Sequence, residues 1–182
     1  MQGRADALRG LHKPARPEDI DPTHRGWMRL AYDELLASQL ALALVRANMR
    51  RPAGQEHAGD GHLRKQIVAA LPYRLTPSQQ QAVVGIADDL AKPTRMLRLL
   101  QGDVGSGKTV VALLASAAVV ETGRQAALMA PTEILARQHL KTIAPLAEAA
   151  GLRVAILTGR ERGRERDALL SALAAGEVDL LV

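Results

Sequence analysis

The chain has 182 residues, 47% of them hydrophobic and 24% charged, a composition typical of a folded domain with a modest core. It has no cysteine, which excludes disulfides, thiolate metal ligands and a cysteine nucleophile, and its 2% aromatic content is too low for a base-stacking platform. The 24 basic and 19 acidic residues leave a formal charge of +5, which suits a phosphate-bearing partner without identifying one.

The first part of the chain predicts a connecting segment followed by one long helix. Residues 1–26 are rich in proline, arginine and aspartate and show no period, so we interpret them as a tail. Asp21-Pro22 is a good helix start, and residues 27–49 carry leucines at helical spacing. Residues 52–61 predict a loop. A helix of this length and apolarity must dock on something, so we expect it to be a strut between domains.

From Leu63 onward, apolar runs alternate with helical patterns. The predicted helices cover residues 63–71, 76–90, 108–121, 133–149 and 165–174, and the last three are expected to end at Gly123, Gly151 and Gly176. The predicted strands cover 96–100, 126–130, 154–157 and 178–182. Near-continuous apolar strands alternating with helices indicate an α/β fold with a parallel sheet covered on both faces.

One segment fits the phosphate-binding P-loop pattern G-x-x-x-x-G-K-[ST] at every position. It consists of Gly102, Asp103, Val104, Gly105, Ser106, Gly107, Lys108 and Thr109. It follows a predicted strand and opens a predicted helix, where backbone N–H groups and the helix N-terminus favour anions. We expect Lys108 to reach the β- and γ-phosphates of ATP and Thr109 to offer its hydroxyl to Mg²⁺.

The segment before the second helix of this part has two interpretations. In the first, Thr76 caps the helix and Gln79 completes a capping box. In the second, the amide of Gln79 reads the edge of adenine while Tyr73 stacks on the ring. The P-loop downstream favours the second interpretation, and both hold if the cap positions Gln79.

The turns after the second and third predicted strands are candidates for contacts with a DNA backbone. In the first turn Pro131 and Thr132 start a helix whose N–H groups can grip a phosphate, while Arg137, Gln138 and His139 follow within two turns. The second turn contains Thr158 and Gly159. The alternative for both is a capped helix with solvated polar residues. In the arginine-rich stretch 160–167, interleaved acids favour a solvated, ion-paired helix start.

An acid that could hold Mg²⁺ is missing from the expected place. Asp179 is the acid associated with a predicted strand, but it lies at the start of that strand rather than at the carboxyl end, where a nucleotide would bind. No Asp-Glu pair follows an apolar strand. We therefore expect the chain to bind ATP but not to hydrolyse it alone.

Four blocks of sequence together resemble the leading motifs of superfamily 2 helicases. They are residues 71–79, 102–112, 129–139 and 157–159, and residues 29–42 resemble a helix that joins a DNA-wedge domain to the motor. Within that superfamily the resemblance is to bacterial ATP-dependent helicases that remodel stalled forks and branched DNA. It implies a RecA-like ATP-binding domain in which Tyr73 and Gln79 read adenine, and Thr132 and Thr158-Gly159 touch DNA.

The resemblance implies two regions and a set of partners. Residues 1–62 would be the helical linker, and residues 63–182 would be the first part of helicase domain 1, cut before its Asp-Glu motif. The implied partners are ATP, Mg²⁺ and branched duplex DNA, and we expect a monomeric, cytoplasmic, nucleoid-associated protein that meets no membrane. A different P-loop enzyme, such as a small-molecule kinase or transporter ATPase, and a non-catalytic nucleotide-binding module are the alternatives.

Overall fold

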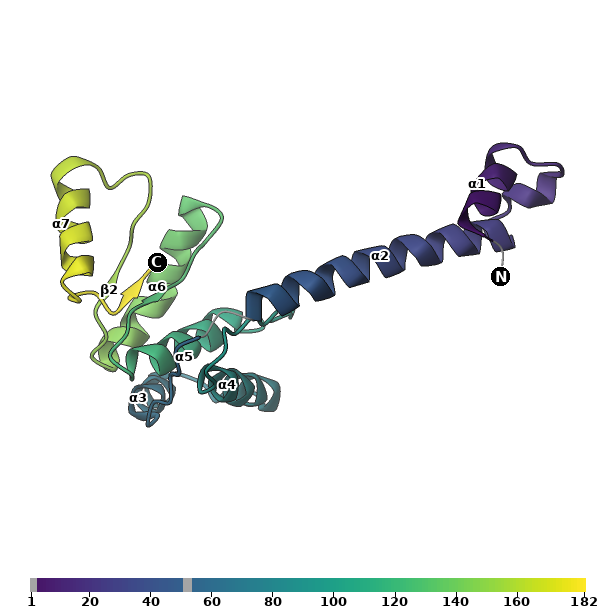
Figure 1. Cartoon of the computed structure of the whole chain (residues 1–182). Coiled ribbons are helices and arrows are strands. Elements are labelled where there is room, and N and C mark those ends of the chain that lie inside the picture. Colours follow the sequence, from purple (N-terminus) through teal and green to yellow (C-terminus); the bar gives the residue numbers. More distant parts are fainter. Residues whose placement is uncertain (1–2, 51–53) are drawn as a thin grey trace. The chain divides into compact units, whose positions relative to one another are not determined.

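The computed structural model describes residues 3–50 and 54–182 (Figure 1). The chain divides into two compact units, Met1–Arg51 and Pro52–Val182, and each is described by itself. Within the described ranges, none of the helices combines the length and apolarity that a bilayer crossing requires.

The first unit is more helical than the sequence indicates. It contains α1 (Arg4–His12), a 3-10 helix (Pro17–Ile20) and α2 (Arg25–Arg50). The prediction of an irregular tail is therefore wrong for α1 and for the 3-10 helix. Ala7 is buried where α1 packs against the start of α2, close to Gly26. A helix that buries one small residue leaves no hydrophobic period in the sequence, which explains the error.

The predicted helix start at Asp21-Pro22 is also wrong, because α2 begins at Arg25. The Asp21 carboxylate accepts hydrogen bonds from the backbone N–H of Thr23 at 2.7 Å and from its hydroxyl at 2.6 Å. Asp21 thus closes a local turn instead of capping a helix, a competing use of aspartate that sequence alone does not separate.

Helix α2 runs for 26 residues, about 39 Å, and matches the helix predicted over residues 27–49. It exposes many large apolar side chains within its own unit. These include Trp27, Met28, Tyr32, Leu35, Leu36, Leu40, Leu42, Leu44 and Val45.

In the second unit, helix α5 (Lys108–Val120) forms the centre of the core. Its sequence is apolar on almost every face, which is the pattern of a helix surrounded by protein. Around it lie α3 (His62–Ala70), α4 (Pro77–Leu90) and α6 (Glu133–Ala149), and Figure 1 shows α3 and α4 beside α5. The fully buried side chains come from α3, α5, α6 and the last strand and include Ile67, Leu113, Leu114, Ile143 and Leu180.

The sheet is parallel, as predicted, but the described residues form three of the four expected strands, each only two residues long. Strands β1 (Ala126–Ala127), β2 (Val154–Ala155) and β3 (Leu180–Leu181) are ordered β1-β3-β2, so that β3 lies in the middle. Its Leu180 is opposite Ala126 on one side and Val154 on the other. Helix α6 connects β1 to β2, and helix α7 (Gly163–Ala174) connects β2 to β3.

The strand predicted over residues 96–100 is not formed. The described residues before the P-loop have no ladder with β1, β2 or β3, and Leu99 is 81% exposed. An apolar segment becomes a strand only where another strand supplies hydrogen-bonding partners, and the sequence pattern reports apolarity rather than pairing.

Two predicted helix ends are confirmed by their geometry. Gly151 has φ +73°, and the N–H of Leu152 donates to the carbonyl of Ala147 at the end of α6. Gly176 has φ +74° and ends α7 in the same way. Both are six-residue Schellman closures, which require a residue tolerant of positive φ, and they turn the chain directly into β2 and β3.

Candidate functional site

The P-loop joins the segment after α4 to the N-terminus of α5, which begins at Lys108. Gly105 and Gly107 adopt positive φ angles of +83° and +81°, a conformation that glycine adopts without strain. A Cβ on Gly102 would lie 2.6 Å from the hydroxyl of Ser106, closer than real contacts allow. The loop is therefore a tight, exposed turn whose backbone can approach a ligand.

The ammonium group of Lys108 lies inside this loop. It donates hydrogen bonds to the carbonyl oxygens of Gly102 and Asp103, each at 2.7 Å. A positive charge held among exposed peptide groups at a helix N-terminus is an arrangement suited to an anion such as a phosphate. The next residue, Thr109, has its hydroxyl 3.5 Å from Nδ1 of His139 on α6.

Gln79 makes the capping box and also contacts the P-loop. Its Oε1 accepts the backbone N–H of Thr76 at 2.9 Å, and its own N–H donates to the Thr76 hydroxyl at 3.3 Å. Its Nε2 donates to the carbonyl of Ser106 at 2.8 Å. The capping interpretation is confirmed, and the cap fixes the amide of Gln79 at the edge of the loop.

A hollow of about 250 Å³ lies between α4 and the P-loop. Its lining includes Gln79, Gly102, Asp103, Ser106 and Lys108. Tyr73, the predicted stacking partner, is 49% exposed and is not among the lining residues.

A second hollow, of about 310 Å³, lies at the carboxyl ends of the three strands. Both predicted DNA-contacting turns line it, through Pro131 and Thr132 after β1 and through Thr158 and Gly159 after β2. The Thr132 hydroxyl accepts the N–H of Leu135 at 3.3 Å and so caps α6, as the sequence predicts. The carboxyl ends of parallel strands are where α/β proteins bind ligands.

An ion-paired cluster holds these two turns together. Arg137 on α6 donates from Nε to Glu133 at 3.0 Å, and from Nη2 to Glu161 at 3.1 Å and to the Thr158 hydroxyl at 3.3 Å. The hydrogen bond to Glu133, with that to Glu161, raises the pKa of Arg137 above its ordinary value. Hydrogen bonds from the hydroxyl and N–H of Thr158 lower the pKa of Glu161 to about 2.

The three polar residues on α6 that are predicted to contact DNA have different surroundings. Arg137 is taken up by the cluster, Gln138 is exposed, and His139 is partly buried against Thr109. Arg160 in the arginine-rich stretch pairs with Glu133 on α6 rather than with a neighbouring acid of its own stretch.

Asp179 is engaged away from the P-loop, in keeping with its place at the start of β3. Its carboxylate forms an ion pair with Arg153 at 2.6 Å and also accepts the backbone N–H of Arg153 at 2.7 Å. The hydrogen bond from the Arg153 guanidinium lowers the pKa of Asp179 below the ordinary carboxyl value. This acid fixes β2 against β3.

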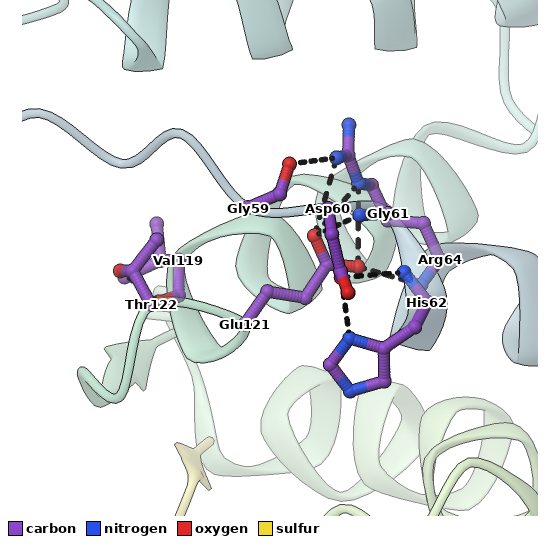
Figure 2. Close-up of polar contacts among 8 residues, drawn as sticks. All are labelled: Gly59, Asp60, Gly61, His62, Arg64, Val119, Glu121 and Thr122. Atoms are coloured by element: carbon purple, nitrogen blue, oxygen red, sulfur yellow. Dashed lines mark hydrogen bonds and ion pairs between the residues drawn. The ribbon is translucent and has the colours of Figure 1, made fainter.

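Sequence reasoning missed Glu121, which follows α5 and whose side chain is fully buried (Figure 2). Its carboxylate accepts the backbone N–H groups of Gly61 and Arg64, each at 3.0 Å, and pairs with the Arg64 guanidinium at 3.1 Å. Glu121 therefore caps the start of α3 from the end of α5. These partners lie about 60 residues away in sequence, so no local pattern could reveal the contact.

Asp60, His62 and Glu121 bring three potential metal-ligand atoms within 4.8 Å of one another. Both oxygens of Glu121 already accept N–H groups, and Arg64 places a positive charge beside them. Asp60 accepts from the backbone N–H of His62 and lies 2.6 Å from its Nδ1 (Figure 2). The cluster is built to hold the start of α3, where a further cation is disfavoured.

A nucleotide-type loop at the head of a central helix, beside a small parallel sheet, is the arrangement of a RecA-like motor domain. The chain belongs to the DEAD/DEAH box helicase family, whose model matches residues 76–182. That family uses ATP.

The individual relatives are more specific. The chain is 39% identical over 186 residues to the ATP-dependent DNA helicase RecG of Escherichia coli K12, covering all of this chain and 27% of that protein. It is 41% identical over 177 residues to RecG of Bacillus subtilis, covering 97% of this chain and 26% of the relative. Among solved structures it resembles RecG bound to a three-way DNA junction, with a TM-score of 0.81 and 36% identity over 97% of this chain and 24% of that one. The chain thus spans about a quarter of the length of the relatives it matches.

Proposed function

We propose that this chain provides the ATP-binding half-site and part of the DNA track of a RecG-type DNA translocase acting on branched DNA. The observation that carries the proposal is the P-loop at the N-terminus of α5, with Lys108 held inside it and Gln79 fixed at its edge. On the same unit, the turns after β1 and β2 line a hollow at the strand ends. The relatives named RecG and their junction-bound structure support branched DNA as the substrate.

The residues present fit a nucleotide. Gly105 and Gly107 leave the loop backbone bare, and the hollow of about 250 Å³ lies next to Lys108. In the proposal, the N–H groups of Gly102–Thr109 and the Lys108 ammonium bind phosphate oxygens, and Thr109 offers its hydroxyl to Mg²⁺. Gln79, with Tyr73, recognises adenine. Bound ATP supplies the phosphoanhydride bond, and Mg²⁺ neutralises charge on its phosphates.

Contacts with DNA fall on the second hollow. Pro131 and Thr132 expose the N-terminus of α6 to a backbone phosphate, and Thr158 and Gly159 approach the same strand from the turn after β2. Arg137, Gln138 and His139 follow on α6: Arg137 braces the two turns, Gln138 is open to solvent, and His139 faces Thr109. These contacts recognise the backbone, so they carry no sequence preference.

We propose the remaining assignments from the resemblance to the helicase motifs. Residues 1–62 form the helical linker to a DNA-wedge domain, and residues 63–182 form the first part of helicase domain 1. We propose a monomeric, cytoplasmic, nucleoid-associated protein. The 182-residue chain binds ATP but does not unwind DNA by itself, because unwinding by such motors needs two RecA-like lobes closing on ATP.

Calorimetric titration with Mg-ATP tests the nucleotide site. The variant Lys108→Ala removes the charge held in the loop, so its affinity should fall at least about 100-fold. Lys141→Ala, at an exposed position on α6, is the matched control and should bind as the wild type does. Equal affinity of Lys108→Ala and wild type, with both folded, would refute the site.

Fluorescence anisotropy with labelled DNA tests the second part. The chain should bind a three-way junction and a linear duplex through phosphates, with affinity that falls steeply between about 50 and 200 mM salt. Binding that ignores salt and depends on base sequence would contradict a translocase track.

A further inference from the structure

The carboxylate of Glu161 is enclosed by hydrogen-bond donors from the turn after β2, which lines the second hollow, and from helix α6. Its side chain is only 10% exposed. It accepts the backbone N–H of Thr158 at 2.5 Å, the Thr158 hydroxyl at 2.6 Å and Nη2 of Arg137 at 3.1 Å. A peptide N–H, a hydroxyl and a guanidinium therefore converge on one anion.

These three donor types are the ones that proteins use to hold a DNA phosphate. A phosphate oxygen and a carboxylate oxygen accept the same charge-assisted hydrogen bonds, and both pair with arginine in a forked geometry. Thr158 is also one of the residues that the proposed function assigns to the DNA backbone. The donors of that contact are thus already satisfied within the chain.

The positive charges of the arginines around Glu161 are also balanced by carboxylates. Arg137 is paired with Glu133 and Glu161, and Arg160 is paired with Glu133. Two arginines are thus balanced by two glutamates, so this rim of the hollow carries little net positive charge for a phosphate.

We propose that the carboxylate of Glu161 occupies the position that a DNA phosphate would bind. DNA then contacts Thr158 and Arg137 only by displacing this internal carboxylate. This inference rests on the proposed function and deepens it: Glu161 sets how tightly this turn engages the backbone. The low pKa of Glu161 agrees with a carboxylate that stays ionised and bound to its donors. DNA contact and the Glu161 contact therefore exclude each other.

The test compares Glu161→Gln with Glu165→Gln in the 182-residue chain. Both variants remove one negative charge, but Glu165 is exposed in the first turn of α7 and takes no part in the cluster. Glu161→Ala is a second variant, because a glutamine amide would still accept from Thr158. The probe is a fluorescein-labelled duplex, titrated at four salt concentrations.

Glu161→Ala should bind the duplex about tenfold more tightly than Glu165→Gln, because its freed donors gain one phosphate contact. Glu161→Gln, whose amide still accepts from Thr158 but carries no charge, should bind with an affinity between those two. The slope of log affinity against log salt should steepen by about 0.9, which is one added phosphate. Affinity and slope equal to those of Glu165→Gln, or weaker binding, would overturn the inference while leaving the proposed function intact. Failure of the wild type and of every variant to bind DNA would overturn both.

Discussion

Replacing Glu121 with alanine should lower the free energy of unfolding of the second unit by about 4 kcal/mol. The carboxylate is fully buried and its partner Arg64 is only 22% exposed, so the variant leaves a largely buried guanidinium without its counter-charge. Removing one partner of a buried pair costs about 3–5 kcal/mol. The N–H groups of Gly61 and Arg64 also lose their acceptor, but partial hydration of Arg64 keeps the total near the middle of that range.

Urea unfolding followed by circular dichroism measures the loss, and peptide-resolved hydrogen exchange shows whether it falls on residues 54–182. Glu148→Ala, at an exposed position on α6, is the control and should change stability by less than about 0.5 kcal/mol. Combining Glu121→Ala with Arg64→Met should cost clearly less than the two single losses together, because the second substitution removes the orphaned charge. A loss for Glu121→Ala no larger than that of the control would refute the reasoning.

Two smaller effects should also be measurable. Thr76→Ala removes the cap that fixes Gln79, so unfolding by urea should show a loss of about 1 kcal/mol and calorimetry a weaker affinity for Mg-ATP; an unaltered affinity would separate the cap from the nucleotide site. Asp179 has a lowered pKa in the folded state because of Arg153, so its pairing stabilises the fold above the ordinary carboxyl pKa and is lost as pH falls through the lower folded value. Asp179→Asn should therefore be less stable than the wild type at pH 7, with the gap closing in strong acid, and a gap independent of pH would contradict this.

The features predicted correctly from sequence are those set by neighbouring residues. Each of these features involves partners within six residues, so the local sequence is enough to predict it. They are the helix caps at Thr76 and Thr132 and the helix ends at Gly151 and Gly176. The helix predicted over residues 108–121 likewise matches α5, because its apolar run directly after the P-loop is a local signal.

The features missed or misassigned depend on contacts between distant segments. Residues 96–100 are apolar enough for a strand, but pairing decides whether a strand forms. Glu121 and Glu161 look like surface acids in the sequence. Glu121 is enclosed by donors about 60 residues away, and Glu161 accepts a hydrogen bond from Arg137, 24 residues away, in addition to those from nearby Thr158. Asp21 shows the opposite case, in which a good local signal for a cap is used by a turn.

Helix α5 is tied at both ends, and this fixes its length. Its first residue is Lys108, which lies in the P-loop, and the residue after its last turn is Glu121, which reaches α3. Inserting one residue into an α-helix rotates everything beyond it by about 100° and advances it by about 1.5 Å. Such an insertion in α5 would swing the Glu121 carboxylate off the start of α3 while leaving the loop sequence intact. The fold therefore requires the spacing of 13 residues between Lys108 and Glu121, just as the P-loop requires its own sequence pattern.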